Sequence, residues 1–302
     1  HYLRLAIPCS LNLALSGVPF NGPDVGGFAN DTNPQLLADW QKACFLFPFC
    51  RNHSATGTRR QEPWAFDART LDICRHYIQL RYKLRPYLYN LFIRQSEHGD
   101  AILRPLFHDF DNTGELNLDR VDDQFLIGPA ILQAPILDEK KRTRRVVLPG
   151  SQHWWSALDG KWIRGNRVVS AAPGPKQTPL YVREGQIIPM AEGLPDTNRW
   201  TPNRIEAHVF LRNTRGAVAE TVYAFDDGDT ENAPRSSVAL HAHVTRGTLA
   251  LETKTLQDGF GPCRIDFFLY DAFKRVTLNG RPLNFRRTTW PLCGTPQRVW
   301  QT

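Results

Sequence analysis

The sequence predicts an α/β segment built from parallel βα units, followed by two antiparallel β-sandwich domains. Residues 1–103 alternate helical periodicity with short apolar runs, which is typical of parallel βα units. Beyond residue 103 the runs are short and separated by glycine, proline and aspartate turns, as in sandwiches. A chain of 302 residues holds more than one domain. We therefore expect three domains, at 1–103, 104–192 and 193–302.

The α/β segment is expected to contain three helices and two strands. Apolar residues recur at helical spacing over residues 3–15. A second helix is expected to begin near Pro34, because proline suits the first helical turn. The third covers about residues 70–98 and ends before Gly99, since glycine is favoured just past a helix end. The strands are indicated by the apolar runs Gly17–Asn21 and Cys44–Phe49.

Short apolar runs bounded by turn residues predict the strands of the two sandwich domains. In the first domain they are Ile102–Phe107, Gln124–Ile127, Ala130–Ala134, Arg145–Leu148 and Pro179–Val182. In the second they are Ala207–Leu211, Thr221–Phe225 and Ile265–Leu269.

Charge and hydropathy argue against nucleic-acid and membrane partners. The net charge is +7, and its densest cluster is Lys140–Arg145. This cluster leads directly into an apolar run and has no interleaved base-stacking aromatics, so we interpret it as a solvated turn. No apolar run approaches the roughly 20 residues that span a bilayer. Composition does not settle the cellular compartment.

The spacing of the cysteines bears on whether the chain binds a metal, and the identity of its first residue bears on whether the sequence is a fragment. None of the six cysteines forms a CxxC pair, and no Cys/His cluster has zinc spacing, so we expect no metal site. The chain begins at His1 and its only methionine is Met190. We therefore expect an internal fragment, or a chain whose first segment was removed.

Asp24 and Phe28 stand out because they follow the first predicted strand across a Gly-Gly pair. In a parallel barrel this position faces the catalytic mouth. A carboxylate there accepts hydrogen bonds from sugar hydroxyls, while an aromatic ring packs on the apolar sugar face. The alternative is that Asp24 caps a turn and Phe28 fills the core.

Arg51 and His53 follow the second predicted strand in the same way. An imidazole can donate a hydrogen bond to a sugar hydroxyl while its other nitrogen is held by a neighbour. A structural histidine is the alternative, and Arg59, Arg60 and Glu62 would then form an ion-pair brace for the loop.

Together these segments resemble glycoside hydrolase family 31, the family of α-glucosidases and α-xylosidases. The resemblance extends over essentially the whole chain and is weakest after about residue 235. The matching stretches, in order, are Leu15–Phe20, Asp24–Phe28, Phe47–Phe49, Arg51–His53, Arg60–Trp64, Leu80–Tyr89, Arg104–Phe107, Asp122–Gly128, Val182–Pro189 and Asp226–Gly228.

The resemblance implies the C-terminal part of a (β/α)8 barrel followed by proximal and distal β-domains. It implies that Asp24, Phe28 and His53 line the subsite for the sugar whose bond is cut, with Arg51 beside it. Family members are retaining glycosidases, which need a nucleophilic carboxylate and a second carboxyl as acid/base. The segments that resemble these two positions are absent from this sequence. We expect no catalytic residue here, and Asp24 lacks a carboxylate partner for that role.

By resemblance, the intact protein removes terminal α-linked sugar, most simply α-glucose, from oligosaccharides, without a cofactor. α-Xylosidase, α-galactosidase and transglucosidase are alternatives within the family, and a non-catalytic carbohydrate-binding or scaffold fragment is another. The expected partners are an oligosaccharide or α-glycoside substrate and the missing N-terminal part of the same enzyme. The chain alone is expected to be inactive.

Overall fold

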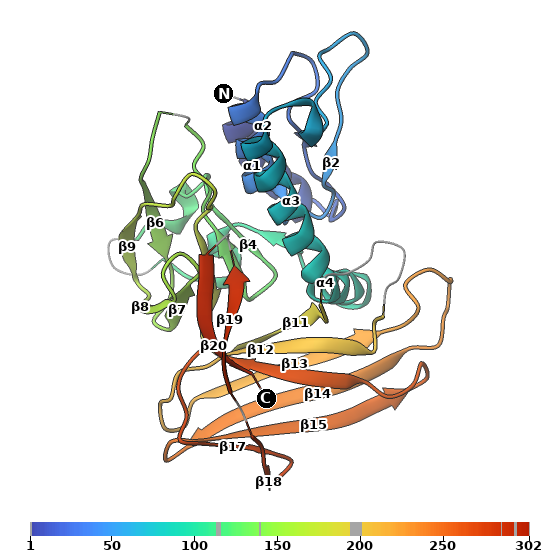
Figure 1. Ribbon diagram of the computed structural model, residues 1–302, viewed down its shortest axis with the longest axis vertical. Helices are drawn as coiled ribbons and strands as arrows, with labels where there is room; N and C mark the ends of the chain where they lie inside the picture. Colours follow the sequence, from blue (N-terminus) through green and yellow to red (C-terminus); the bar gives the residue numbers. More distant parts are fainter. Residues whose placement is uncertain are drawn as a thin grey trace. The chain divides into compact units, whose positions relative to one another are not determined.

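The computed structural model describes residues 2–112, 116–138, 140–193, 201–284, 286–292 and 295–301 (Figure 1). The backbone forms two compact units. Unit 1 consists mainly of residues 1–81 and 95–182, and unit 2 mainly of residues 82–94 and 183–291. The predicted division at 103 and 192 stays a prediction, and two segments near these positions, 82–94 and 183–192, lie in unit 2.

Unit 1 begins with two helices that the sequence predicted. Helix α1 covers Tyr2–Leu15 and α2 covers Pro34–Cys44. The Asn33 side chain caps α2 by accepting the backbone N–H of Leu36 at 2.9 Å, which satisfies one of the donors that a helix start leaves free. Pro34 takes the first helical position, where a missing N–H costs nothing.

The two predicted strands of the α/β segment were placed a few residues too early. The run 17–21 forms a turn in which Val18 N–H donates to Leu13 O, and Phe20 is 61% exposed. The run 44–49 is largely buried but also turns. The carbonyls of Phe45 and Phe47 accept hydrogen bonds from the Arg81 guanidinium instead of from a neighbouring strand. The strands follow each turn, as β1 (Asp24–Val25) and β2 (Arg51–Asn52).

The long helix predicted over residues 70–98 is two helices. Helix α3 covers Ala68–Lys83 and α4 covers Arg85–His98. Proline has no N–H and disfavours helical backbone in the residue before it, so Pro86 interrupts the helix near Leu84. Gly99 ends α4 as predicted, with a φ of +75° and its N–H bonded to Gln95 O. A short 3-10 turn, η1 (Pro63–Ala65), precedes α3.

The second half of unit 1 is β-rich. A six-stranded sheet has the order β3-β4-β5-β10-β7-β8, and β6 pairs with β9. Leu126, Leu132, Trp154 and Tyr181 belong to the core between these strands. The bounds are β3 (Leu103–Arg104), α5 (Leu106–Asp109), η2 (Leu118–Arg120), β4 (Phe125–Ile127), β5 (Ile131–Gln133), β6 (Arg144–Leu148), β7 (His153–Ser156), β8 (Lys161–Arg164), β9 (Arg167–Ala171) and β10 (Leu180–Arg183).

One residue of the predicted solvated turn is not solvated. Arg144 begins β6, and its side chain is 9% exposed. Its guanidinium donates to the Asp123 carboxylate at 2.8 Å and to Pro135 O at 2.6 Å. Arg144 therefore joins two loops, which the run of charges alone did not reveal.

Unit 2 is a sandwich of two five-stranded sheets with the orders β11-β12-β16-β20-β19 and β13-β14-β15-β17-β18. Apolar side chains from both sheets form its core, as in a β-sandwich. Most pairings are antiparallel, but β12 with β16 and β15 with β17 are parallel. The bounds are β11 (Gln186–Ala191), β12 (Arg204–Phe210), β13 (Val218–Phe225), β14 (Ser236–Thr245), β15 (Thr248–Asp258), β16 (Arg264–Leu269), β17 (Arg275–Leu278), β18 (Arg281–Pro282), β19 (Arg286–Leu292) and β20 (Thr295–Gln301).

Among the helices of the described residues, none combines the length and the hydrophobicity that crossing a bilayer requires.

Candidate substrate-binding site

The site is organised by the short parallel ladder between β1 and β2. Asp24 lies opposite Arg51, and Val25 lies opposite Asn52. The register places the two charged residues together, and Arg51 Nε donates to Asp24 Oδ1 at 2.9 Å. The Asp24 side chain is 20% exposed and that of Arg51 is 50% exposed. Asp24 is therefore held in place by a cation while part of its carboxylate still faces the outside.

Two glycines redirect the chain after β1. Gly26 and Gly27 have φ values of +96° and +89°, a region that side chains with a Cβ rarely adopt. Gly27 N–H closes the turn on Asp24 O at 3.0 Å. A Cβ on Gly26 would lie 2.9 Å from Gln61 Nε2, so the backbone passes close to that amide. The turn brings Phe28 back toward the ends of the strands.

Gln61 joins the loops that follow the two strands. It is 5% exposed, and its Nε2 donates to Val25 O at 3.2 Å and to His53 O at 3.0 Å. One buried amide thus holds the backbone on both sides of the ladder. Gln61 was not among the predicted site residues. It stands between an arginine and a glutamate in a polar stretch of sequence, and such a stretch gives no indication of burial.

Phe28 and His53 form the second pair of the site. Their ring centroids are 5.4 Å apart and the ring planes are tilted by 32°. The backbone fixes this arrangement, because Ala55 N–H donates to Phe28 O at 2.8 Å. Phe28 is 49% exposed, and His53 is exposed as well. Phe28 therefore does not fill a core, and Asp24 does more than cap a turn.

All four predicted binding residues thus come together, as the pairs Asp24–Arg51 and Phe28–His53. The ion pair considered as an alternative brace for the following loop is present, because Arg60 Nη2 lies 3.3 Å from Glu62 Oε1 on the exposed surface. The loop is also tied by Arg59 N–H, which donates to Asp31 Oδ1 at 2.6 Å. Beneath the ladder, burial raises the pKa of the Cys50 thiol, so Cys50 stays neutral.

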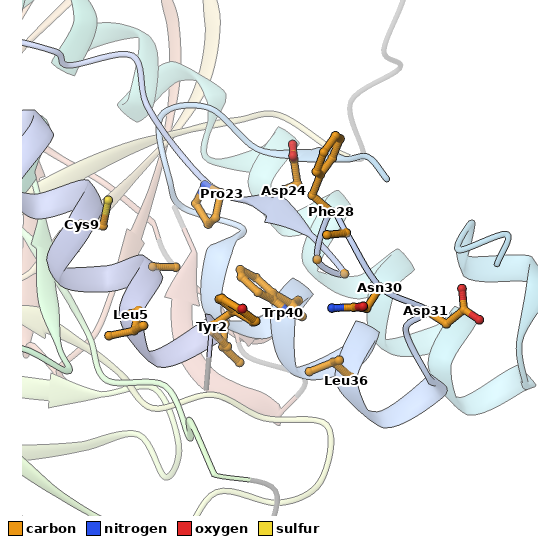
Figure 2. A pocket seen from close by; sticks show the side chains of 15 residues that line it. Tyr2, Leu5, Cys9, Pro23, Asp24, Phe28, Asn30, Asp31, Leu36 and Trp40 are labelled. Carbon is orange, nitrogen blue, oxygen red and sulfur yellow. The ribbon is translucent and has the colours of Figure 1, made fainter. Parts of the chain in front are cut away.

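A cavity of about 570 Å³ lies beside the ladder, with Asp24 and Phe28 in its lining. Figure 2 shows its other walls, which come from α1, from the loop after β1 and from α2. Trp40 of α2 and Tyr2 of α1 give it a largely aromatic and apolar character. Arg51 and His53 are not lining residues, so they act on this space through Asp24 and Phe28.

The wall contributed by α1 is an apolar helix face that nothing in the described residues covers. Leu3, Ile7 and Leu11 bury one face of α1. On the opposite face Tyr2 is 73%, Leu5 48% and Leu13 41% exposed. A helix that is apolar on both sides normally packs on both sides. The helix that contributes this wall therefore exposes apolar side chains on its outer face.

Comparison with known protein families shows to which family this chain belongs. Residues 1–91 match the glycosyl hydrolases family 31 TIM-barrel domain, and residues 99–188 match the glycosyl hydrolase family 31 C-terminal domain. The chain belongs to glycosyl hydrolase family 31. The expected fold class, the end of a (β/α)8 barrel followed by β-rich domains, is confirmed.

Curated relatives of this family 31 chain include α-glucosidases. It is 33% identical over 288 residues to Alpha-glucosidase 2 of Bacillus thermoamyloliquefaciens, which covers 94% of this chain and 36% of the relative. It is 32% identical over 229 residues to Neutral alpha-glucosidase C of Mus musculus, which covers 75% of this chain and 25% of the relative. The chain thus spans about a third or less of these relatives.

Solved family 31 structures share the fold. A Flavobacterium johnsoniae dextranase complexed with glucose superposes with a TM-score of 0.77 at 21% identity, over 93% of this chain and 35% of the other. The alpha subunit of a glucosidase II gives a TM-score of 0.79 at 21% identity, over 99% and 35%. At this identity the likeness concerns the fold.

Proposed function

We propose that the intact protein is a retaining α-glycosidase that releases terminal α-linked glucose, and that this chain supplies one wall of its sugar-binding subsite. The observation that carries the proposal is the pairing of Asp24 with Arg51 and of Phe28 with His53 at the edge of one cavity. An anchored carboxylate beside an exposed ring matches the alternating hydroxyl and C–H faces of a pyranose. The α-glucosidase names of the curated relatives support glucose as the sugar.

Each residue has a physical role in this proposal. The Asp24 carboxylate accepts hydrogen bonds from two sugar hydroxyls, and the Arg51 guanidinium keeps it oriented. Phe28 packs on the apolar face of the sugar ring, and the His53 ring, which lies tilted against Phe28, holds Phe28 in position. None of these steps breaks the glycosidic bond. The two carboxylates that a retaining glycosidase needs come from the part of the barrel outside this sequence.

The same preceding part is the proposed partner of α1. The exposed face of Tyr2, Leu5 and Leu13 would pack against it, and the open side of the cavity would be closed by it. This proposal rests on the exposed apolar surface and on the share of the curated relatives that this chain spans.

The test uses the longest available form of the protein and a panel of aryl α-glycosides. We expect hydrolysis of the α-glucoside in preference to the α-xyloside and α-galactoside. Asp24→Asn should lower kcat/KM about 10- to 100-fold, because a hydrogen bond to a charged acceptor contributes about 1.5–3 kcal/mol. The control is Glu62→Gln, which changes a carboxylate of the adjacent loop outside the cavity lining.

Two outcomes would contradict the proposal. If no α-glycoside is hydrolysed while the protein binds oligosaccharides, the chain belongs to a carbohydrate-binding protein instead. If Asp24→Asn and Glu62→Gln both keep the parental kcat/KM, Asp24 does not contact the sugar.

A further inference from the structure

Two histidines and a glutamate meet on the outer surface of unit 2. Strand β14 alternates strictly: Val238, Leu240, Ala242 and Val244 are buried in the core of the sandwich. The residues between them face outward, and these include His241 and His243. On the neighbouring strand β15, Glu252 lies directly opposite His241. Figure 1 shows β13, β14 and β15 running next to one another.

The donor atoms of the three side chains converge. His241 Nδ1 lies 3.8 Å from Glu252 Oε2, and His243 Nδ1 lies 4.0 Å from Glu252 Oε1. All three ligand atoms lie within 4.8 Å of one another. Each carboxylate oxygen thus faces a different imidazole, which is the arrangement around a shared central ligand.

The two imidazole nitrogens have no hydrogen-bond partner among the described residues. His241 Nδ1 and His243 Nδ1 are both shielded from solvent, although their side chains are about a third exposed. Their distances to Glu252 are too long for hydrogen bonds. Buried polar atoms are normally paired, so two adjacent orphaned nitrogens aimed at one carboxylate indicate a ligand.

We propose that His241, His243 and Glu252 form a surface binding site for a divalent transition cation of the zinc class. Two imidazole nitrogens and one carboxylate oxygen suit Zn²⁺, which binds them at about 2.0–2.2 Å, whereas Ca²⁺ and Mg²⁺ prefer oxygen ligands. Tetrahedral ligands at those bond lengths lie roughly 3.4 Å apart. To bind an ion, the ligand atoms, which lie within 4.8 Å of one another, would therefore have to approach by up to about 1.4 Å, which side-chain rotations can supply.

The surrounding strands favour a cation as well. Glu220 of β13 lies directly opposite His241 on its other side, so a second carboxylate shares this face of the sheet. Cross-strand neighbours of this kind have Cβ atoms about 5 Å apart. Three protein ligands leave a fourth position open, and Glu220 is placed to hold a water molecule there.

A metal site was not expected from the sequence, because its cysteines and histidines lack the spacing of zinc ligands along the chain. His241 and His243 are separated by one residue, but Glu252 is brought to them only by the β14–β15 register. The β14–β15 hairpin therefore brings together three metal-ligating side chains whose proximity cannot be recognised from their spacing in the sequence.

The test is calorimetric titration of Zn²⁺ into the tag-free, metal-stripped 302-residue chain, with Mg²⁺ and Ca²⁺ in parallel. We expect one Zn²⁺ per chain and no heat from the other two ions. His243→Gln and Glu252→Gln should each weaken Zn²⁺ binding at least about tenfold. Both substitutions lie on the outer face of the sheet, so the core of unit 2 is unchanged.

A histidine outside the cluster provides the control. His98→Gln alters a surface histidine that also neighbours a glutamate, Glu97, at 3.9 Å but belongs to no cluster of three metal-ligating side chains within the described part of the chain, and it should leave Zn²⁺ affinity unchanged. Co²⁺ should give visible absorption bands with the parent chain and lose them in His243→Gln. Absence of Zn²⁺ binding by the parent chain would overturn the proposal, as would equal affinity in the parent, His243→Gln and Glu252→Gln proteins. Because metal binding is read directly, these outcomes do not depend on glycoside hydrolysis.

Discussion

Gly26 shows how tightly single residues determine this site. Its backbone has a φ of +96°, and a Cβ would meet Gln61 Nε2 at 2.9 Å. That amide cannot move away easily, because it bonds to Val25 O and His53 O. Gly57 has a similar φ of +86° but open space around it. Substituting Gly57 therefore measures the free-energy cost of backbone strain alone, whereas substituting Gly26 measures that cost together with the cost of a close contact.

We predict that Gly26→Ala lowers the free energy of unfolding by more than Gly57→Ala does. Backbone strain alone costs on the order of 1 kcal/mol, which is the expected effect at Gly57. Loss of the Gln61 hydrogen bonds should add about another 1–2 kcal/mol at Gly26. Urea titration of the two variants followed by far-UV circular dichroism measures the difference. Equal losses would show that Gln61 adapts without cost.

The four residues predicted from the sequence lie together in the candidate site, whereas Gln61, which joins their loops, was not predicted. Asp24 and Arg51 follow apolar runs and precede glycine or polar turns. This local pattern predicts that both residues lie near the end of a strand. Gln61 acts through two carbonyls that are distant in sequence. Nothing in its own neighbourhood encodes those partners.

At the scale of elements, the sequence pattern located the helical segments and several sandwich strands, such as β4, β5 and β12, but misplaced β1 and β2. Helix α1 repeats its apolar face over four turns, so its period is well defined. Strands β1 and β2 have two residues each, which is too short for any period to be detected. Buried turns imitate strands in sequence when a side chain satisfies their carbonyls, as Arg81 does for Phe45 and Phe47.

A buried ionic network on β12 gives unit 2 a dependence on pH. Lys83 Nζ contacts both carboxylate oxygens of Glu206 at 2.8 Å, and His208 Nε2 lies 3.3 Å from Glu206 Oε2. Burial raises the pKa of Glu206, but the hydrogen bond from His208 and the charge of Lys83 outweigh burial and lower that pKa from 4.5 to about 2. Burial also lowers the pKa of His208, which keeps its imidazole neutral.

We predict that the Glu206 carboxylate stabilises unit 2 above pH 4.5 and that this contribution disappears as the pH falls toward 2. A lowered folded-state pKa means that the unfolded chain takes up the proton first. The shift corresponds to about 3 kcal/mol, which Glu206→Gln should remove from the pH dependence of unfolding. The control Glu220→Gln changes an exposed carboxylate of the same unit. Parallel pH profiles for the parent and Glu206→Gln chains would contradict this prediction.

At the scale of the whole molecule, the exposure of the outer face of α1 is the property expected to differ between this chain and a longer polypeptide. In this chain Leu13 is 41% exposed, whereas Leu11 on the opposite face is 5% exposed. If the preceding part of the barrel covers the outer face, Leu13 becomes a core residue in the longer protein. Burying a leucine side chain contributes about 1.5–3 kcal/mol.

We predict that Leu13→Lys leaves the free energy of unfolding of this chain unchanged in urea titration, because the Leu13 side chain already faces outward. In the longer protein the same substitution should lower the free energy of unfolding by about 2 kcal/mol or more. Leu11→Lys is the matched control and should destabilise both forms. Leu13→Lys with no effect on the longer protein would refute a covering element.

The ladder of β1 and β2 has a consequence for reconstitution. Within the described part of the chain these strands pair only with each other, so each presents an open parallel edge, and such edges recruit further strands. A separately produced polypeptide carrying the remaining barrel strands would have a template to join. Mixing the two pieces would show whether the added strands pair with the outer edges of β1 and β2, which flank the Asp24–Arg51 register.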